Sequence, residues 1–163
     1  MAYGKVWKYG NNINTDIISP PFSLELPIKE AAKFTMQAVD PDFAATFRKG
    51  DVFVAEHNLG SGSSRENAPL MLRELGVKIV VAKDYARIFY RNCINVGVIP
   101  IECADTGKIS KGDMIEVDYA NGLIRNQTTG ETYVCSKMPP HIEAIIDAGG
   151  LIPYIQNVRL KKK

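Results

Sequence analysis

The sequence predicts an α/β fold with a largely parallel βαβαβ core and a small β-rich appendage. Between residues 51 and 101, apolar runs rich in Val and Ile alternate with helical patterns, which is typical of parallel strands joined by right-handed crossovers. After residue 113, strand-like runs are separated by Asn121-Gly122 and Thr129-Gly130, which favour tight turns between strands. A length of 163 residues fits a single domain over residues 1–163.

The first fifty residues predict one strand and two short helices around an irregular loop. Residues 6–9 indicate a short strand, and the polar, Asn- and Pro-rich residues 10–22 are expected to lack regular structure. Residues 28–38 predict a helix because apolar side chains recur at helical spacing, at Ile28, Ala31, Ala32 and Met36. A second short helix is expected between residues 41 and 50.

The central segment carries the alternation that defines the fold class. Three strands are predicted from apolar, β-branched runs, at residues 51–55, 77–82 and 98–101. A glycine-rich loop, residues 57–64, follows the first strand and leads into a helix over residues 65–75, which Gly76 ends. A second helix is expected to be capped by Asp84 and to run to Gly97.

The C-terminal third predicts three short strands and a final helix. The strands are expected at residues 114–118, 123–126 and 132–135. The helix is expected over residues 139–148, ended by Gly149-Gly150. Residues 159–163 form the only run of charge and are interpreted as a solvated end.

Composition argues against several classes of function. Twenty basic and 18 acidic residues leave a net charge of +2, whereas nucleic-acid binding usually needs a strong basic excess. No apolar run approaches the ~20 residues of a membrane span, and the N-terminus lacks the apolar region of a signal peptide. Three widely spaced cysteines without a CxxC pair favour a reducing, cytoplasmic location. With only His57 and His141 besides, we expect no metal site built by this chain alone.

The glycine-rich loop and the residues after it are the best candidate for chemistry. The segment 58–66 leaves a predicted strand and opens a predicted helix. Such a junction presents unpaired N–H groups and the positive end of the helix dipole, so it favours anions. Ser63, Ser64 and Arg65 stand at its mouth, and an arginine can bind a carboxylate through two parallel hydrogen bonds.

Three other interpretations of this loop compete with an anion site. In the simplest one, Ser64 only caps the helix and Arg65 is solvated. Gly60 and Gly62 have the spacing of a dinucleotide fingerprint, but Arg65 stands where its third glycine should allow close helix packing. A nucleophile elbow does not fit, because no serine lies in a Gly-x-Ser-x-Gly pattern.

Four stretches of the sequence resemble the aconitase swivel domain, in the same order. Gly60-Ser61-Gly62-Ser63-Ser64-Arg65-Glu66 is similar to its Gly-x-Gly-Ser-Ser-Arg-Glu signature. Asn14-Thr15-Asp16 resembles its N-terminal active-site segment, residues 86–97 its second core helix, and residues 148–154 its C-terminal end. Together they span nearly the whole chain, so the resemblance is far more specific than one glycine loop.

The resemblance implies a hydro-lyase that works as two subunits. In this family the swivel domain can be a separate small subunit, and a large partner carries a 4Fe–4S cluster, so no cofactor is expected on this chain. The family moves a hydroxyl between neighbouring carbons by removing and re-adding water. The nearest members are small subunits of isopropylmalate isomerase-like enzymes, which implies an alkyl-substituted malate as substrate. A 2,3-dimethylmalate dehydratase, a homoaconitase and a non-catalytic anion-binding module remain alternatives.

The resemblance also implies roles for individual residues. Ser63 corresponds to the base, acting as an alkoxide, and hydrogen-bond donors around it must stabilise that anion. Ser64 and Arg65 correspond to residues that hold a substrate carboxylate. Asp16 corresponds to a carboxylate that supports a histidine of the large subunit. His57 matches no family role and is interpreted as structural or exposed.

A second loop, residues 22–25, is expected to read the substrate's side chain. Homoaconitase-type subunits carry an arginine here for a distal carboxylate, and the aligned residue in this chain is Leu24, between Phe22 and Leu26. An unpaired buried carboxylate costs several kcal/mol, so Leu24 and Phe22 favour an alkyl group. The alignment leaves the position open by one residue, and the alternative remains that this loop packs against the partner subunit.

Overall fold

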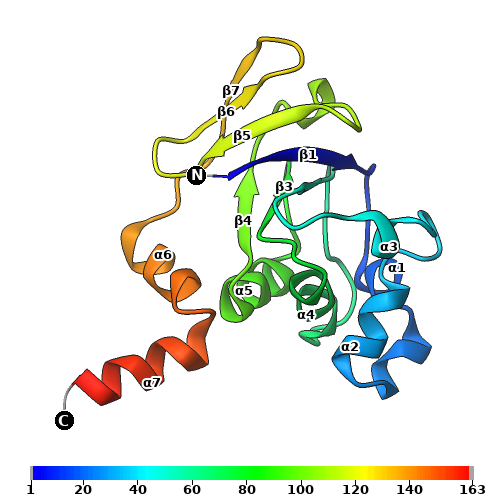
Figure 1. The fold of residues 1–163 in the computed structure, drawn as a ribbon, viewed down its shortest axis with the longest axis vertical. Helices are drawn as coiled ribbons and strands as arrows, with labels where there is room; N and C mark the ends of the chain where they lie inside the picture. Colours follow the sequence, from blue (N-terminus) through cyan, green and yellow to red (C-terminus); the bar gives the residue numbers. More distant parts are fainter. Residues whose placement is uncertain (1, 162–163) are drawn as a thin grey trace.

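The computed structural model describes residues 2–161 and is built on one seven-stranded sheet (Figure 1), in the order β4-β3-β2-β1-β5-β6-β7. Four strands are parallel: β1 (Ala2–Lys8), β2 (Val52–Val54), β3 (Ile79–Ala82) and β4 (Ile99–Glu102). Three are antiparallel: β5 (Met114–Asp118), β6 (Leu123–Asn126) and β7 (Thr132–Val134). The mixed α/β fold is therefore confirmed, and the β-rich appendage extends the same sheet through β1.

Both faces of the parallel strands are buried, which explains their continuous apolar runs. Val6 and Trp7 of β1 point to opposite faces, as neighbours in a strand must. Trp7 joins a core of aromatic side chains around Phe43 and Phe53, whose rings lie 5.9 Å apart at 84°. Val6 joins a second, mainly aliphatic core on the other face.

Two main helices, α4 (Asn67–Glu74) and α5 (Arg87–Val96), follow β2 and β3 in the chain and pack against each other. They lie together below the sheet in Figure 1. Both begin two residues later than their patterns predict. The residue before α4 is Glu66, so the interpretation of Ser64 as its cap is wrong. The residue before α5 is Ala86, and Asp84 instead accepts bonds from the loop described below.

The region before β2 holds more regular structure than its composition predicts. Within residues 10–22 lies the short helix α1 (Thr15–Ile18), because the Asn14 side chain accepts a hydrogen bond from the Ile17 N–H at 2.8 Å. A 3₁₀ turn, η1 (Pro21–Glu25), follows it. The expectation of no regular structure was wrong here, because a single side-chain cap is enough to start a one-turn helix.

The helix predicted over residues 28–38 is shorter in the structure. It splits into α2 (Ile28–Ala31) and a 3₁₀ turn, η2 (Ala32–Phe34). The Thr35 hydroxyl donates to the Ala32 carbonyl, a local bond that competes with helix continuation. Met36 has a φ of 63° and donates its N–H to Ile18 in α1. A tertiary contact therefore ends the helix, while the expected short helix α3 (Phe43–Thr46) is present.

The C-terminal part contains one helix that the sequence analysis missed. After the 3₁₀ turn η3 (Thr106–Lys108) and strands β5 to β7, the predicted final helix is α6 (Pro140–Asp147). A further helix, α7 (Leu151–Lys161), projects away from the body of the molecule in Figure 1 and buries none of its residues. Residues 159–161 of the expected tail end this helix and are exposed, and residues 162–163 lie outside the described chain.

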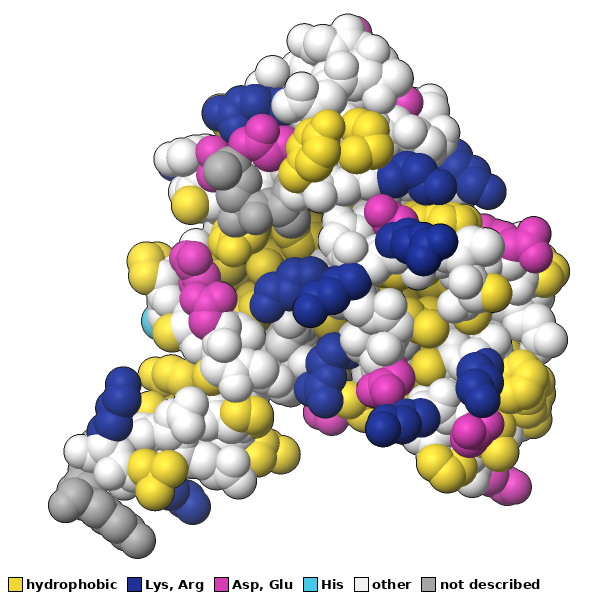
Figure 2. Space-filling model, in the orientation of Figure 1, with side chains coloured by type: hydrophobic (Ala, Val, Ile, Leu, Met, Phe, Trp, Pro, Cys, Tyr) yellow, Lys and Arg dark blue, Asp and Glu magenta, His cyan; other side chains and the backbone are white. Residues whose placement is uncertain are grey.

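The surface carries basic and acidic side chains in similar numbers, as the net charge of +2 indicates. On the face seen in Figure 2, basic and acidic side chains are scattered among each other and form no single basic surface. Within residues 2–161, none of the helices has the length and apolar character needed to span a membrane.

Candidate active site

A small cleft gathers four of the predicted site residues from three separate segments. Asp16 comes from α1, Leu24 from η1, and Ser63 and Arg65 from the residues between β2 and α4. The other lining residues, which the sequence analysis did not assign, are Thr15, Ser19, Asn67 and Ala68. The segments that hold Asp16 and Ser63 follow the carboxyl ends of β1 and β2, where ligands bind in open α/β sheets.

The cleft is too small to enclose a substrate by itself. Its volume is about 20 Å³, which is room for about one water molecule. Asp16, Ser63 and Arg65 are exposed at its mouth, and Leu24 is half-buried. A dicarboxylate bound here would therefore need a second wall from outside the described chain.

Two predicted site residues do not line the cleft. Ser64 is exposed, and its carbonyl accepts a hydrogen bond from the Asn92 side chain of α5 at 2.9 Å. Phe22 is 56% exposed and packs edge-on against Phe34, with ring centroids 4.9 Å apart. Phe22 therefore faces the outer side of its turn.

Of residues 23–25, only one side chain borders the cleft. Ser23 is fully buried and donates its hydroxyl to the Pro20 carbonyl at 2.6 Å. Glu25 is exposed, and neither Ser23 nor Glu25 lines the cleft. Of these three neighbours, Leu24 is the one whose side chain borders Ser63 and Arg65 across the cleft.

The glycine-rich loop is held in a conformation that requires its glycines. Gly60 has a φ of +85°, and a Cβ there would lie 2.0 Å from Cγ of Phe89 in α5. Gly62 has a φ of +109°. Residue types with a side chain rarely adopt such backbone angles. The loop also continues the parallel pairing beyond β2 and β3 through a bridge between Leu59 and Tyr85, so the sheet and α5 together fix its path.

The Ser63 hydroxyl lies next to a backbone donor and shortly before the start of a helix. The Ser63 hydroxyl oxygen accepts a hydrogen bond from the Arg65 N–H at 3.2 Å. Helix α4 begins at Asn67, so its positive end lies shortly beyond the hydroxyl in the chain. The Arg65 guanidinium makes no ion pair with a carboxylate of residues 2–161. It is therefore available to bind a carboxylate at the cleft.

An ion cluster anchors the start of the glycine-rich loop. Glu56 lies 2.6 Å from the ammonium of Lys8 and 3.1 Å from that of Lys83, and it accepts the Thr106 hydroxyl at 2.8 Å. Burial alone would raise the pKa of Glu56, but the hydrogen bonds from Lys8, Thr106 and Lys83 outweigh it and lower the pKa. Glu56 is therefore held charged beneath the loop.

His57 and Asp84 form a second support for the loop. Nδ1 of His57 lies 2.7 Å from Asp84 Oδ2, and the Asn58 N–H donates to Asp84 Oδ1 at 2.6 Å. The hydrogen bond with His57, followed by the one from Asn58, lowers the pKa of Asp84. The His57 side chain is 59% exposed, in agreement with a structural or exposed role. Asp84 was missed as a loop support because its position resembles a helix cap.

The described residues offer no donor set for a metal ion. Within residues 2–161, no group of three or more His, Cys, Asp or Glu side chains is placed to hold one. Cys93, Cys103 and Cys135 are free and buried. Desolvation raises the pKa of the Cys93 and Cys103 thiols and raises that of Cys135 to about 12, which disfavours the thiolate form that binds metals.

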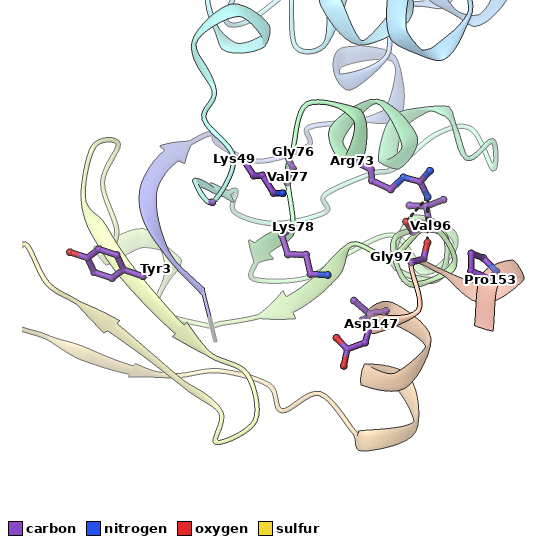
Figure 3. Close-up of a pocket in the computed structure, with 13 residues that line it drawn as sticks. Tyr3, Lys49, Arg73, Gly76, Val77, Lys78, Val96, Gly97, Asp147 and Pro153 are labelled. Carbon is purple, nitrogen blue, oxygen red and sulfur yellow. Dashed lines mark hydrogen bonds between the residues drawn. The ribbon is translucent and has the colours of Figure 1, made fainter. Parts of the chain in front are cut away.

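A larger cleft of about 690 Å³ lies away from these residues. Its lining includes Gly50, Lys78 and Gly97, which stand just before β2, β3 and β4. Figure 3 shows Lys78 and Gly97 at this cleft. It is thus at the amino ends of the parallel strands, whereas the glycine-rich loop is at their carboxyl ends. None of the predicted site residues lines it.

Comparisons with known proteins bear on this site. The Aconitase C-terminal domain model matches residues 29–106. The 3-isopropylmalate dehydratase small subunit of Methanosarcina mazei is 46% identical over 95% of this chain and 96% of its own length. The isopropylmalate/citramalate isomerase small subunit of Methanocaldococcus jannaschii is also 46% identical, over 94% of this chain and 92% of its own. A crystal structure of 3-isopropylmalate dehydratase from the same organism covers 99% of this chain and 96% of that chain, at a TM-score of 0.93 and 38% identity.

Proposed function

The chain belongs to the family of 3-isopropylmalate dehydratase small subunits, within the aconitase superfamily, and from this premise we propose how its residues serve that hydro-lyase. The small subunit supplies one wall of an active site that interconverts 3-isopropylmalate and 2-isopropylmalate. A large subunit supplies the other wall. The observation that carries the proposal is the cleft in which Asp16, Leu24, Ser63 and Arg65 meet.

We assign the base to Ser63. Dehydration removes a proton from a carbon beside a carboxylate while the hydroxyl leaves the neighbouring carbon, so a double bond forms between the two. Ser63 takes that proton as an alkoxide and returns it when water adds back in the other direction. A serine is a poor base unless its anion is stabilised. The Arg65 N–H, which already donates to the Ser63 oxygen, provides part of that stabilisation.

Arg65 and Leu24 bind the two ends of the substrate. The Arg65 guanidinium pairs with a substrate carboxylate, and a charge-assisted bond of this kind contributes roughly 1.5–3 kcal/mol. Leu24 faces the substrate's alkyl group and offers no partner to a distal carboxylate. Asp16 lies exposed at the cleft, where its carboxylate can orient a histidine of the large subunit. We assign Ser64, which is exposed next to Arg65 in the chain, as a second contact for the same carboxylate.

We assign the 4Fe–4S cluster to the large subunit. The described part of this chain does not fit such a group, because its three cysteines are buried and no three candidate ligands meet. The departing hydroxyl therefore lies on the large subunit's side of the site. Three free cysteines are also compatible with a reducing cytoplasm. We treat residues 1–163 as one domain, since all strands between Ala2 and Val134 belong to a single sheet.

Co-expression with the iron–sulfur large subunit tests this function. The complex should turn over 3-isopropylmalate, and the purified chain alone should be colourless and inactive. Citramalate is assayed as well, because one relative is named for both substrates. 2,3-Dimethylmalate and homoaconitate test the remaining substrate classes. An assembled, iron-loaded complex that is inactive on all four would favour a non-catalytic anion-binding module instead.

A further inference from the structure

The segment after β1 and the glycine-rich loop lie side by side at the cleft. The Gly60 N–H donates to the Ile13 carbonyl at 2.7 Å, and the Thr15 N–H donates to the Ser61 carbonyl at 2.8 Å. These backbone bonds fix the loop as far as Ser61. They do not reach Ser63, which stands two residues further along and is exposed.

The side chain of Thr15 makes the next connection. Its Oγ1 accepts a hydrogen bond from the Ser63 N–H at 3.0 Å. Thr15 is only 6% exposed and lines the same cleft as Ser63. Between the two bonds stands Gly62, where a Cβ would lie 3.0 Å from that Oγ1. The absence of a side chain at Gly62 therefore leaves the space that the Thr15 hydroxyl occupies.

Two hydrogen bonds hold Ser63 within the loop. Its hydroxyl oxygen accepts from the Arg65 N–H, and its own peptide N–H donates to the Thr15 hydroxyl. The Ser63 N–H is thereby committed to Thr15 and is not a donor to substrate. A buried, short side chain with few rotamers is well suited to such a role.

We propose that Thr15 is a positioning residue, whose hydroxyl fixes the Ser63 peptide so that the Ser63 oxygen faces the cleft. The proposal rests on the assignment of Ser63 as the base. Misplacement of a reacting group by about 1 Å can reduce turnover roughly 100-fold. The loss of the Thr15 oxygen should therefore appear in turnover and not chiefly in substrate binding.

Two variants of Thr15 separate its oxygen from its shape. Thr15→Val keeps the branched shape and removes the acceptor, whereas Thr15→Ser keeps the acceptor. In the complex with the large subunit, Thr15→Val should lower kcat at least about tenfold while KM for 3-isopropylmalate changes less than about threefold. Thr15→Ser should recover most of the lost kcat. A Thr15→Val enzyme within twofold of the wild type would overturn the proposal.

A matched control removes an equivalent bond elsewhere. Thr35 is 1% exposed, and its Oγ1 donates to the Ala32 carbonyl at 2.7 Å, in a turn that does not line the cleft. Thr35→Val should lower the thermal stability of the chain about as much as Thr15→Val and leave kcat unchanged. An equal fall in kcat in both variants would make the Thr15 effect a general consequence of instability and overturn the proposal.

The double variant distinguishes this proposal from the function on which it rests. If Thr15 acts through Ser63, Thr15→Val combined with Ser63→Ala should be no slower than Ser63→Ala alone. A further loss in the double variant would show that Thr15 acts independently and would overturn the positioning role, while the base role of Ser63 would stand. A fully active Ser63→Ala enzyme would remove the base role and the positioning role together.

Discussion

The glycine at position 60 allows a quantitative test of how the loop is held. In Gly60→Ala, the new methyl would lie 2.0 Å from Cγ and 2.3 Å from Cβ of Phe89. Ring rotation cannot relieve the second contact, because Cβ is bonded to the backbone of α5. Overpacking of this kind costs about 1–3 kcal/mol, and the φ of +85° adds about 1–2 kcal/mol. The free energy of unfolding should therefore fall by about 2–5 kcal/mol.

Two other glycines separate the cost of the contact with Phe89 from the cost of the backbone conformation. Gly130→Ala meets nothing within 4 Å but has a φ of +79°, so it should show the backbone cost of about 1–2 kcal/mol alone. Gly10→Ala also meets nothing within 4 Å and does not have such a φ, so its effect should stay within about 0.5 kcal/mol. The assay is urea unfolding of the isolated chain. A loss below about 1 kcal/mol in Gly60→Ala, or one no larger than in Gly130→Ala, would refute the close contact with Phe89.

Three further predictions concern charge at and beneath the cleft. Arg65→Lys keeps the charge but loses the planar guanidinium that can bind a carboxylate through two hydrogen bonds. In the assembled enzyme, kcat/KM should fall about tenfold or more, with unchanged stability. Unchanged kinetics would mean that Arg65 is a solvated residue without contact to substrate. Leu24→Arg should shift the ratio of kcat/KM toward homoaconitate by about tenfold, whereas Glu25→Arg, outside the cleft, should not. If Leu24→Arg leaves the ratio unchanged in an assembled, active enzyme, this turn does not read the substrate. The lowered pKa of Glu56 gives stability that is present above the ordinary carboxyl pKa of 4.5 and is lost as the pH falls through the lower folded value. Unfolding measured from neutral to acid pH should show this loss in the wild type and a smaller one in Glu56→Gln, and parallel curves would contradict it.

The elements that local sequence could predict are those with a strong local pattern. The run over residues 77–82 is rich in Val and Ile, as expected of a strand that is buried on both faces. This local composition was enough to predict β3. Helices α4 and α5 end at glycines, which is why their ends were predicted better than their starts. The end of α2 depends instead on the Met36 N–H, which bonds to Ile18 in a different segment. Such a bond has no signal in the residues around it.

The residues of the candidate site also differ in whether the local sequence indicates them. Ser63 and Arg65 could be proposed as site residues from the sequence because they belong to one continuous motif. Thr15 and Asn92 were not assigned, because each reaches the site only through packing between distant segments. Asn67 was not assigned because it lies in the interior of the helix expected over residues 65–75. The interpretation of the motif as the start of a helix was also too simple. The motif is an extended turn before α4, and side chains of α1 and α5 hold it from either side.

The most direct test of the account is the turnover of Ser63→Ala in the complex with the large subunit. Loss of one exposed hydroxyl should cost the fold about 1 kcal/mol or less, so the variant should fold and assemble as the wild type does. Its kcat on 3-isopropylmalate should fall at least about 100-fold, the scale of a lost general base, with the large subunit's cluster still bound. Turnover within a few-fold of the wild type would contradict the assignment of Ser63 as the base that this chain contributes.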